Sequence, residues 1–192
     1  MEFQGTWKEI WTQKGLVEGT KADIRNYDGW EKSSTSMEDI ANKIKECLKI
    51  EPSDRVLEIG CGAGGLAQFF DCDYVGVDFS KPLVEKCNQF FSKKAIYAEA
   101  NNLPFDDKSF DKCFSWGVFL YFPSMVYMND VVTNIKRVTR GAIFIGDIPV
   151  KSHDDKHMIY TKEDFETLGF ETIDGWSHPY EQERFNALLK TT

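Results

Sequence analysis

Hydrophobic residues form two kinds of pattern along this chain, and the two kinds alternate. Apolar residues at intervals of three and four predict helices that begin after Ser80, after Ser124 and at Thr161, and Ser80 and Ser124 are expected to cap their helices. Residues 1–52 are expected to be helical, with a capping-box pattern at Thr35 and Glu38, and residues 66–70 favour another helix. Short apolar runs predict five strands and two weaker candidates, at 55–59, 74–78, 95–99, 110–116, 142–147, 171–175 and 184–189.

Strands that alternate with helices imply β-α-β units, which give a largely parallel sheet with helices on both faces. We therefore expect an α/β fold. In such sheets ligands bind beyond the carboxyl ends of the strands, at the point where the strand order reverses. This rule directs attention to five segments that directly follow predicted strands, 60–65, 78–80, 99–102, 115–117 and 147–150.

Composition and charge narrow the function classes. The 192 residues carry 23 Lys and Arg against 31 Asp and Glu, a net charge of −8, which argues against a nucleic-acid substrate. Aromatic residues make up 14% of the chain, which argues against disorder. We expect no membrane span and no secretory signal, because no apolar run is long enough and the first ten residues have no apolar segment. Five cysteines without metal-ligand spacing fit a reducing cytoplasm and predict no metal site.

The most informative motif is the glycine-rich segment 58–65, which follows the first strand. Gly60, Gly62 and Gly65 have the spacing G-x-G-x-x-G, and glycines let a ligand approach the backbone. Asp78 ends the second strand 18 residues after Gly60, where an acid can accept both ribose hydroxyls of an adenosine. The two features together predict a nucleoside-binding site.

Three segments, VLEIGCGAGGLA, VGVDFS and AEANNLPFDDKSFDKCFSWGVFLYFP, resemble successive motifs of class I S-adenosylmethionine-dependent methyltransferases in order and spacing. The resemblance implies a Rossmann-like three-layer α/β/α sandwich with a mostly parallel seven-stranded sheet and an N-terminal helical extension. It implies a single domain over 1–192, in which 1–52 form a lid and 53–192 form the cofactor-binding core. The cofactor would be S-adenosylmethionine, and the product S-adenosylhomocysteine.

The same resemblance assigns cofactor contacts to residues after four of the strands. Glu58 would support the loop and the methionine amino group, Asp78 would hold the ribose, and Phe79 would lie against adenine. The full implied set from the core is Glu58, Gly60, Cys61, Gly62, Gly64, Asp78, Phe79, Ala100, Asn101, Ser115, Trp116 and Gly117. This chain has Glu99-Ala100 where related sequences commonly have Asp-Ala, so adenine contacts are expected from Ala100 and Asn101.

Two segments are candidates for the acceptor pocket. The loop after the fifth strand carries His153 and His157, whose imidazoles titrate near neutral pH and suit a general base. In the N-terminal segment, Tyr27 and Trp30 flank a turn-like Asp28-Gly29 and are expected to contact the sulfonium side. Tyr121, soon after the fourth strand, is a third candidate for the chemistry. Trp7 and Trp11 are expected to be packing residues on one helix face.

We expect a cytoplasmic enzyme, a monomer or homodimer, that moves a methyl group to a small-molecule acceptor at oxygen: a sugar, phosphorylated metabolite or carboxylate. N-methylation of a small amine is the alternative. The Asn-Pro-Pro-Tyr type of motif of base and amide methylation is replaced by Ser115-Trp116-Gly117-Val118, and Asp147 alone is a poor metal site. A nicotinamide-dependent oxidoreductase is disfavoured because no tyrosine is followed by lysine at the fourth position. A non-catalytic adenosylmethionine-binding module stays open.

Overall fold

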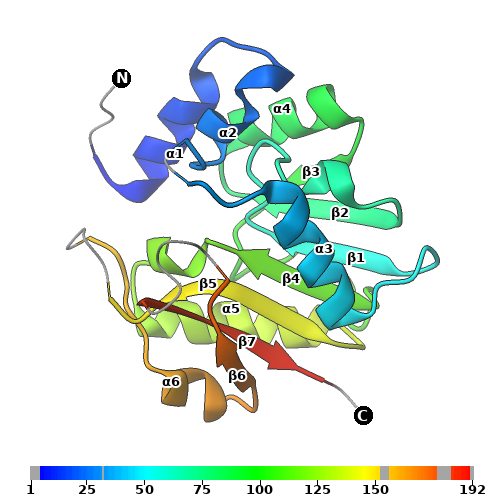
Figure 1. Cartoon of the computed structure of the whole chain (residues 1–192), viewed down its shortest axis with the longest axis vertical. Coiled ribbons are helices and arrows are strands. Elements are labelled where there is room, and N and C mark those ends of the chain that lie inside the picture. The colour runs from blue at the N-terminus through cyan, green and yellow to red at the C-terminus, as the bar shows by residue number, and fades with distance from the viewer. Residues whose placement is uncertain (1–4, 32, 152–155, 177–182, 191–192) are drawn as a thin grey trace.

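The computed structural model describes residues 5–31, 33–151, 156–176 and 183–190, and in them a seven-stranded sheet has the order β3-β2-β1-β4-β5-β7-β6 (Figure 1). The five strands β1 to β5 run parallel, and β7 lies antiparallel between β5 and β6. The predicted mostly parallel seven-stranded sheet is thus confirmed. The strands are β1 (Arg55–Ile59), β2 (Asp73–Asp78), β3 (Lys94–Tyr97), β4 (Lys112–Trp116), β5 (Ile143–Pro149), β6 (Glu171–Asp174) and β7 (Arg184–Leu189).

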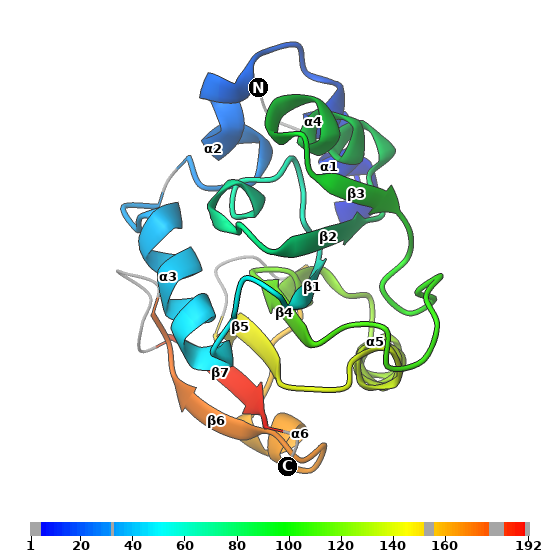
Figure 2. The same cartoon turned by 90° about the vertical axis from the view of Figure 1, so that its right-hand side faces the viewer.

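Helices cover both faces of the sheet because successive side chains of each buried strand point to opposite faces. Val56 and Phe114 belong to a buried cluster with the apolar sides of α3 (Met37–Leu48) and α4 (Lys81–Phe91). Their chain neighbours Leu57 and Cys113 belong to a second cluster with α5 (Met125–Val138) and α6 (Lys162–Glu166). Figure 2 shows α3 and α5 on opposite sides of the sheet. The three-layer α/β/α sandwich is confirmed.

The N-terminal extension is helical and packs beside α4. It contains α1 (Trp7–Leu16), the 3₁₀ turn η1 (Lys21–Asp23) and α2 (Ile24–Tyr27), which lie near α4 in Figure 1. Gly15 of α1 is buried, and a Cβ atom there would lie 2.9 Å from the Pro82 Cβ atom of α4. The missing side chain therefore lets the two helices approach closely.

Three local predictions were wrong. Helix α3 is capped by Ser36, whose hydroxyl accepts a hydrogen bond from the Asp39 amide at 3.2 Å, so Thr35 and Glu38 do not form its capping box. Residues 66–70 form only the 3₁₀ turn η2 (Ala67–Phe69), because the backbone is already extended at Phe70, with φ −105° and ψ 113°. Ser80 precedes α4 but does not cap it with its side chain; its hydroxyl donates to the Trp11 carbonyl at 3.3 Å.

The described part of the chain contains no helix with the length and apolar character that crossing a bilayer requires.

A further 3₁₀ turn, η3 (Phe119–Tyr121), follows β4 and leads into α5. It places a group of aromatic residues directly beyond the carboxyl end of the sheet.

Candidate functional site

A cavity of about 870 Å³ lies beyond the carboxyl ends of β1, β2 and β4. The chain reverses its direction of winding between β1 and β4, so this is the position where an open α/β sheet binds ligands. Its volume lies near the upper end of the range for small-molecule sites, which leaves room for a nucleoside and a second molecule. The predicted residues that line it are Trp30, Glu58, Gly60, Cys61, Gly62, Asp78, Phe79, Ala100, Trp116, Gly117 and Tyr121.

The glycine loop forms the floor of this cavity in a conformation that requires glycine. Gly60 has a φ of 75° and Gly62 a φ of 53°, both in the left-handed region. The amide groups of Gly60 and Cys61 donate to the Val77 carbonyl at 2.8 and 3.0 Å, which joins the loop to β2. A Cβ atom on Gly60 would lie 2.3 Å from a methyl carbon of Val118. A side chain at Gly60 would therefore collide with Val118, so this position of the loop, whose backbone borders the cavity, requires glycine.

Asp78 stands at the end of β2 with its carboxylate against the loop. It accepts hydrogen bonds from the Gly62 amide at 3.0 Å and the Ser80 amide at 2.8 Å. Burial raises its pKa to about 6 despite these two amides, and the nearby Glu99 adds to the increase. A cationic or hydroxyl-bearing ligand would stabilise the ionised form, so this carboxylate is well placed to bind one.

Glu58 is the second buried carboxylate, and it lies at the carboxyl end of β1. Its Oε2 atom accepts a hydrogen bond from the Tyr74 hydroxyl at 2.5 Å. Burial raises the pKa of Glu58 to about 8, and repulsion from Asp28 and Asp78 acts in the same direction, whereas the Tyr74 hydroxyl opposes it. The side chain is only 3% exposed yet borders the cavity, so its charge has no solvent to stabilise it.

Asp28, from the N-terminal extension, supplies a third carboxylate that the sequence did not predict. Its two oxygens accept hydrogen bonds from the Ala63 and Gly65 amides, each at 2.6 Å. Burial raises its pKa to about 7, partly opposed by these amides. Asp28 thereby ties the extension to the glycine loop, and three carboxylates from three segments converge on one side of the cavity.

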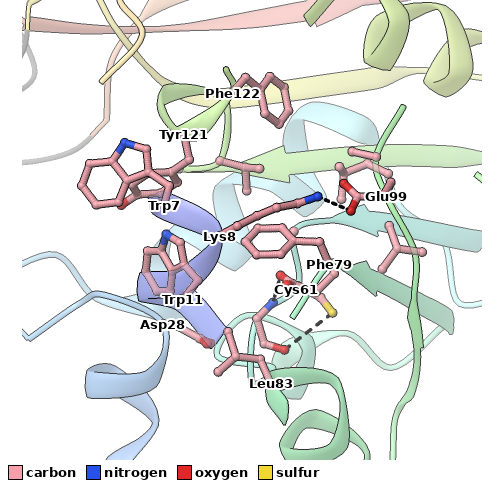
Figure 3. A pocket seen from close by; sticks show the side chains of 18 of the residues that line it. Trp7, Lys8, Trp11, Asp28, Cys61, Phe79, Leu83, Glu99, Tyr121 and Phe122 are labelled. Atoms are coloured by element: carbon pink, nitrogen blue, oxygen red, sulfur yellow. Dashed lines mark hydrogen bonds and ion pairs between the residues drawn. The ribbon is translucent and has the colours of Figure 1, made fainter. Parts of the chain in front are cut away.

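Another part of the cavity wall is aromatic. Trp7 and Trp11 of α1 lie against Tyr121 with ring centroids 4.8 and 5.1 Å apart (Figure 3). His157 stacks on Trp7 with ring centroids 4.7 Å apart. Trp7 and Trp11 line the cavity, so their assignment as packing residues was incomplete. Their spacing of four residues predicted the shared helix face; only the docking of α1 beside η3 turns that face toward the site.

An ion pair crosses from α1 to the segment after β3. Lys8 pairs with Glu99, which also accepts a hydrogen bond from the Tyr127 hydroxyl at 3.2 Å (Figure 3). The Lys8 ammonium lies 5.8 Å from the centroid of the Phe79 ring. Lys8, Glu99 and Tyr127 line the cavity together, and no sequence motif marked Lys8 or Tyr127.

Four predicted cofactor residues lie in the packing behind the wall of the cavity. The Tyr27 ring is buried with Ala63 and Leu83, and its hydroxyl donates to the Val17 carbonyl at 3.2 Å. A Cβ atom on Gly64 would meet Cys87 and Phe91, so this glycine allows α4 to approach rather than a ligand.

The other two predicted residues hold the strand ends in place. The Ser115 hydroxyl donates to the Ile59 carbonyl at 3.0 Å and joins β4 to β1. The Asn101 carbonyl accepts from the Asn134 side chain at 2.8 Å and fixes the segment after β3 to α5. Among the residues that line the cavity, Tyr27, Gly64, Ser115 and Asn101 are absent, and their roles as cofactor contacts stay predictions. His153 lies outside the described residues.

Comparison with known proteins gives a family match for the central part of the chain. Residues 57–145 match a family model described as a methyltransferase domain. The 27-O-demethylrifamycin SV methyltransferase of Amycolatopsis mediterranei is 27% identical over 135 residues, which cover 62% of this chain and 48% of that protein. A sterol 24-C-methyltransferase of Schizosaccharomyces pombe is 29% identical over 89 residues, 41% of this chain and 24% of that protein. The chain thus spans about half or less of these relatives.

Solved structures share the fold over nearly the whole chain. An N-methyltransferase of Bradyrhizobium japonicum in complex with S-adenosyl-L-homocysteine has a TM-score of 0.70 at 15% identity, covering 89% of this chain and 95% of that one. The magnesium protoporphyrin IX methyltransferase of Synechocystis with bound SAH has a TM-score of 0.68 at 12% identity, covering 95% and 93%. At these identities the likeness establishes a common fold.

Proposed function

We propose that this chain, of which residues 57–145 match a family model described as a methyltransferase domain, moves a methyl group from S-adenosylmethionine to a small-molecule acceptor. The observation that carries the proposal is the meeting of Glu58, Asp78 and the open glycine loop at one cavity. S-adenosylmethionine carries a sulfonium and an ammonium group, and buried carboxylates with raised pKa values gain most from such positive charge.

The residues present fit this cofactor in each of its parts. Asp78 would accept hydrogen bonds from the ribose hydroxyls, and Phe79 offers a ring for the adenine. Glu58 and the backbone of Gly60 and Gly62, which line the cavity, would hold the methionine part. When bound, the cofactor supplies an activated methyl group, because the sulfonium makes its sulfur a good leaving group.

The protein's own part in such a transfer is to align donor and acceptor and to exclude water. An oxygen acceptor such as a hydroxyl must lose its proton, and His157 is the described candidate base, because its ring contacts Trp7 and Tyr121, which line the cavity although His157 itself does not. We further propose that residues 1–52 act as a lid within a single domain, supported by the lining of the cavity by α1. A cytoplasmic location and a monomer or homodimer stay predictions.

Isothermal titration with S-adenosylmethionine, S-adenosylhomocysteine and NAD tests the proposal. We expect binding of the first two and none of NAD, and tight binding of NAD alone would overturn it. Asp78→Asn should weaken binding by roughly tenfold or more, since hydrogen bonds to a charged group contribute about 1.5–3 kcal/mol each. The matched control is Asp73→Asn at the other end of β2, whose side chain is 64% exposed. If both variants bind as the unmodified protein does, the cofactor lies elsewhere.

A further inference from the structure

We propose that α1 and η3 together form an acceptor subsite for a planar aromatic ring that bears an oxygen, with Trp7, Trp11 and Tyr121 as the residues that determine this specificity. The inference rests on the proposed function and deepens it, because it names the chemical class of the acceptor. It is carried by the arrangement of the rings and by one buried donor group.

The rings make a continuous aromatic surface on one side of the cavity. Tyr121 meets Trp7 at an interplanar angle of 61° and Trp11 at 72°, so its ring stands edge-on to both (Figure 3). His157 lies nearly parallel to Trp7, at 16°. Flat rings give large contact area and interact best with other rings in stacked or edge-to-face arrangements. A planar ligand therefore gains more from this surface than a puckered sugar of the same size.

One polar group within this surface lacks an acceptor. The indole N–H of Trp7 donates to the Lys156 carbonyl at 3.1 Å. The Trp11 Nε1 atom is buried and has no hydrogen-bond partner among the described residues, and Figure 3 shows it on the edge of the ring that faces Trp7 and Tyr121. Buried donors are normally satisfied. An oxygen on a bound ring would satisfy this donor and fix the orientation of the ring.

The test measures binding to the protein loaded with S-adenosylhomocysteine, so it does not depend on turnover. The probes are 2-naphthol, its saturated counterpart decahydro-2-naphthol, and naphthalene. We expect 2-naphthol to bind at least about tenfold more tightly than the saturated alcohol. Equal binding of 2-naphthol and decahydro-2-naphthol would overturn the inference.

Variants separate the ring contact from the hydrogen bond. Trp7→Leu should weaken 2-naphthol and naphthalene alike, by roughly tenfold, whereas Trp7→Phe should restore most of the binding. Trp11→Phe keeps a ring but removes the N–H, so it should weaken 2-naphthol and leave naphthalene unchanged. The control is Tyr97→Leu, an exposed aromatic residue on β3 outside the cavity lining.

Two failures remain distinguishable. If S-adenosylhomocysteine does not bind the unmodified protein, the proposed function is wrong. If S-adenosylhomocysteine binds all variants equally well, the variants are folded and the proposed function stands. If Trp11→Phe then weakens both aromatic probes equally, or weakens neither, the proposed role of the Trp11 N–H is wrong.

Discussion

Replacing Glu58 with glutamine should make the protein more stable above neutral pH while weakening its affinity for S-adenosylmethionine. Glutamine has nearly the same shape and keeps an oxygen that accepts the hydrogen bond from the Tyr74 hydroxyl. It removes only the charge. The expected gain arises because Glu58 ionises at a site where burial disfavours the carboxylate.

The sign and size follow from the pKa of Glu58, which is about 8 in the folded protein and 4.5 as its ordinary value. Between these values the unfolded chain has released a proton that the folded chain still holds, so the free energy of unfolding falls as pH rises. The slope is at most about 1.4 kcal/mol per pH unit for one group. Glu58→Gln has no such loss, so its advantage should grow by up to about 3 kcal/mol between pH 5 and pH 7.

Denaturant unfolding at pH 5, 6, 7 and 8 measures this difference directly. Glu85→Gln in α4 makes the same chemical change on a side chain that is 66% exposed and should follow the unmodified protein at every pH. Titration with S-adenosylmethionine at pH 8 should show roughly tenfold or greater weakening for Glu58→Gln, because the ligand loses a charged partner. A constant stability difference between Glu58→Gln and the unmodified protein across the pH series would refute the reasoning, and so would unchanged affinity.

Four further substitutions test the fold and the loop. Ser36→Ala should lower the free energy of unfolding by about 1 kcal/mol, whereas Thr35→Ala should have little effect. Thermal unfolding of the two variants measures this difference. Gly60→Ala should cost at least roughly 1–2 kcal/mol for its left-handed backbone and more for its contact with Val118, and titration should show that S-adenosylmethionine binding is lost. Phe70→Ala should cost about 3–5 kcal/mol in denaturant unfolding, because the ring is fully buried.

The glycine loop shows what a local sequence pattern can predict and what it cannot. Its spacing after an apolar strand predicted the turn, and the structure gives Gly60 and Gly62 the positive φ values that the turn needs. The same reasoning treated Gly64 as a ligand contact, yet its neighbour is α4. A glycine signals that a side chain would not fit, and sequence does not say whether a ligand or another helix takes the space.

The cap of α3 shows a second limit. Thr35 and Glu38 have the spacing of a capping box, but Ser36 and Asp39 have an equally good donor and acceptor one residue later. Which residue caps the helix depends on where the apolar side of α3, with Met37 and Ile40, meets the sheet. The packing of this buried face fixes the first residue of the helix, and the residue before it becomes the cap.

The sequence by itself predicted the order of the elements, the parallel core and a nucleoside-binding loop, because each prediction depends on residues close together in the chain. Only the tertiary structure decided what else lines the cavity beside that loop. Asp28 reaches the glycine loop, and Trp7 and Trp11 reach Tyr121, across separations of 35 residues and more. Such contacts depend on how α1 docks against α4 and η3, and no local pattern of polar and apolar residues records that docking.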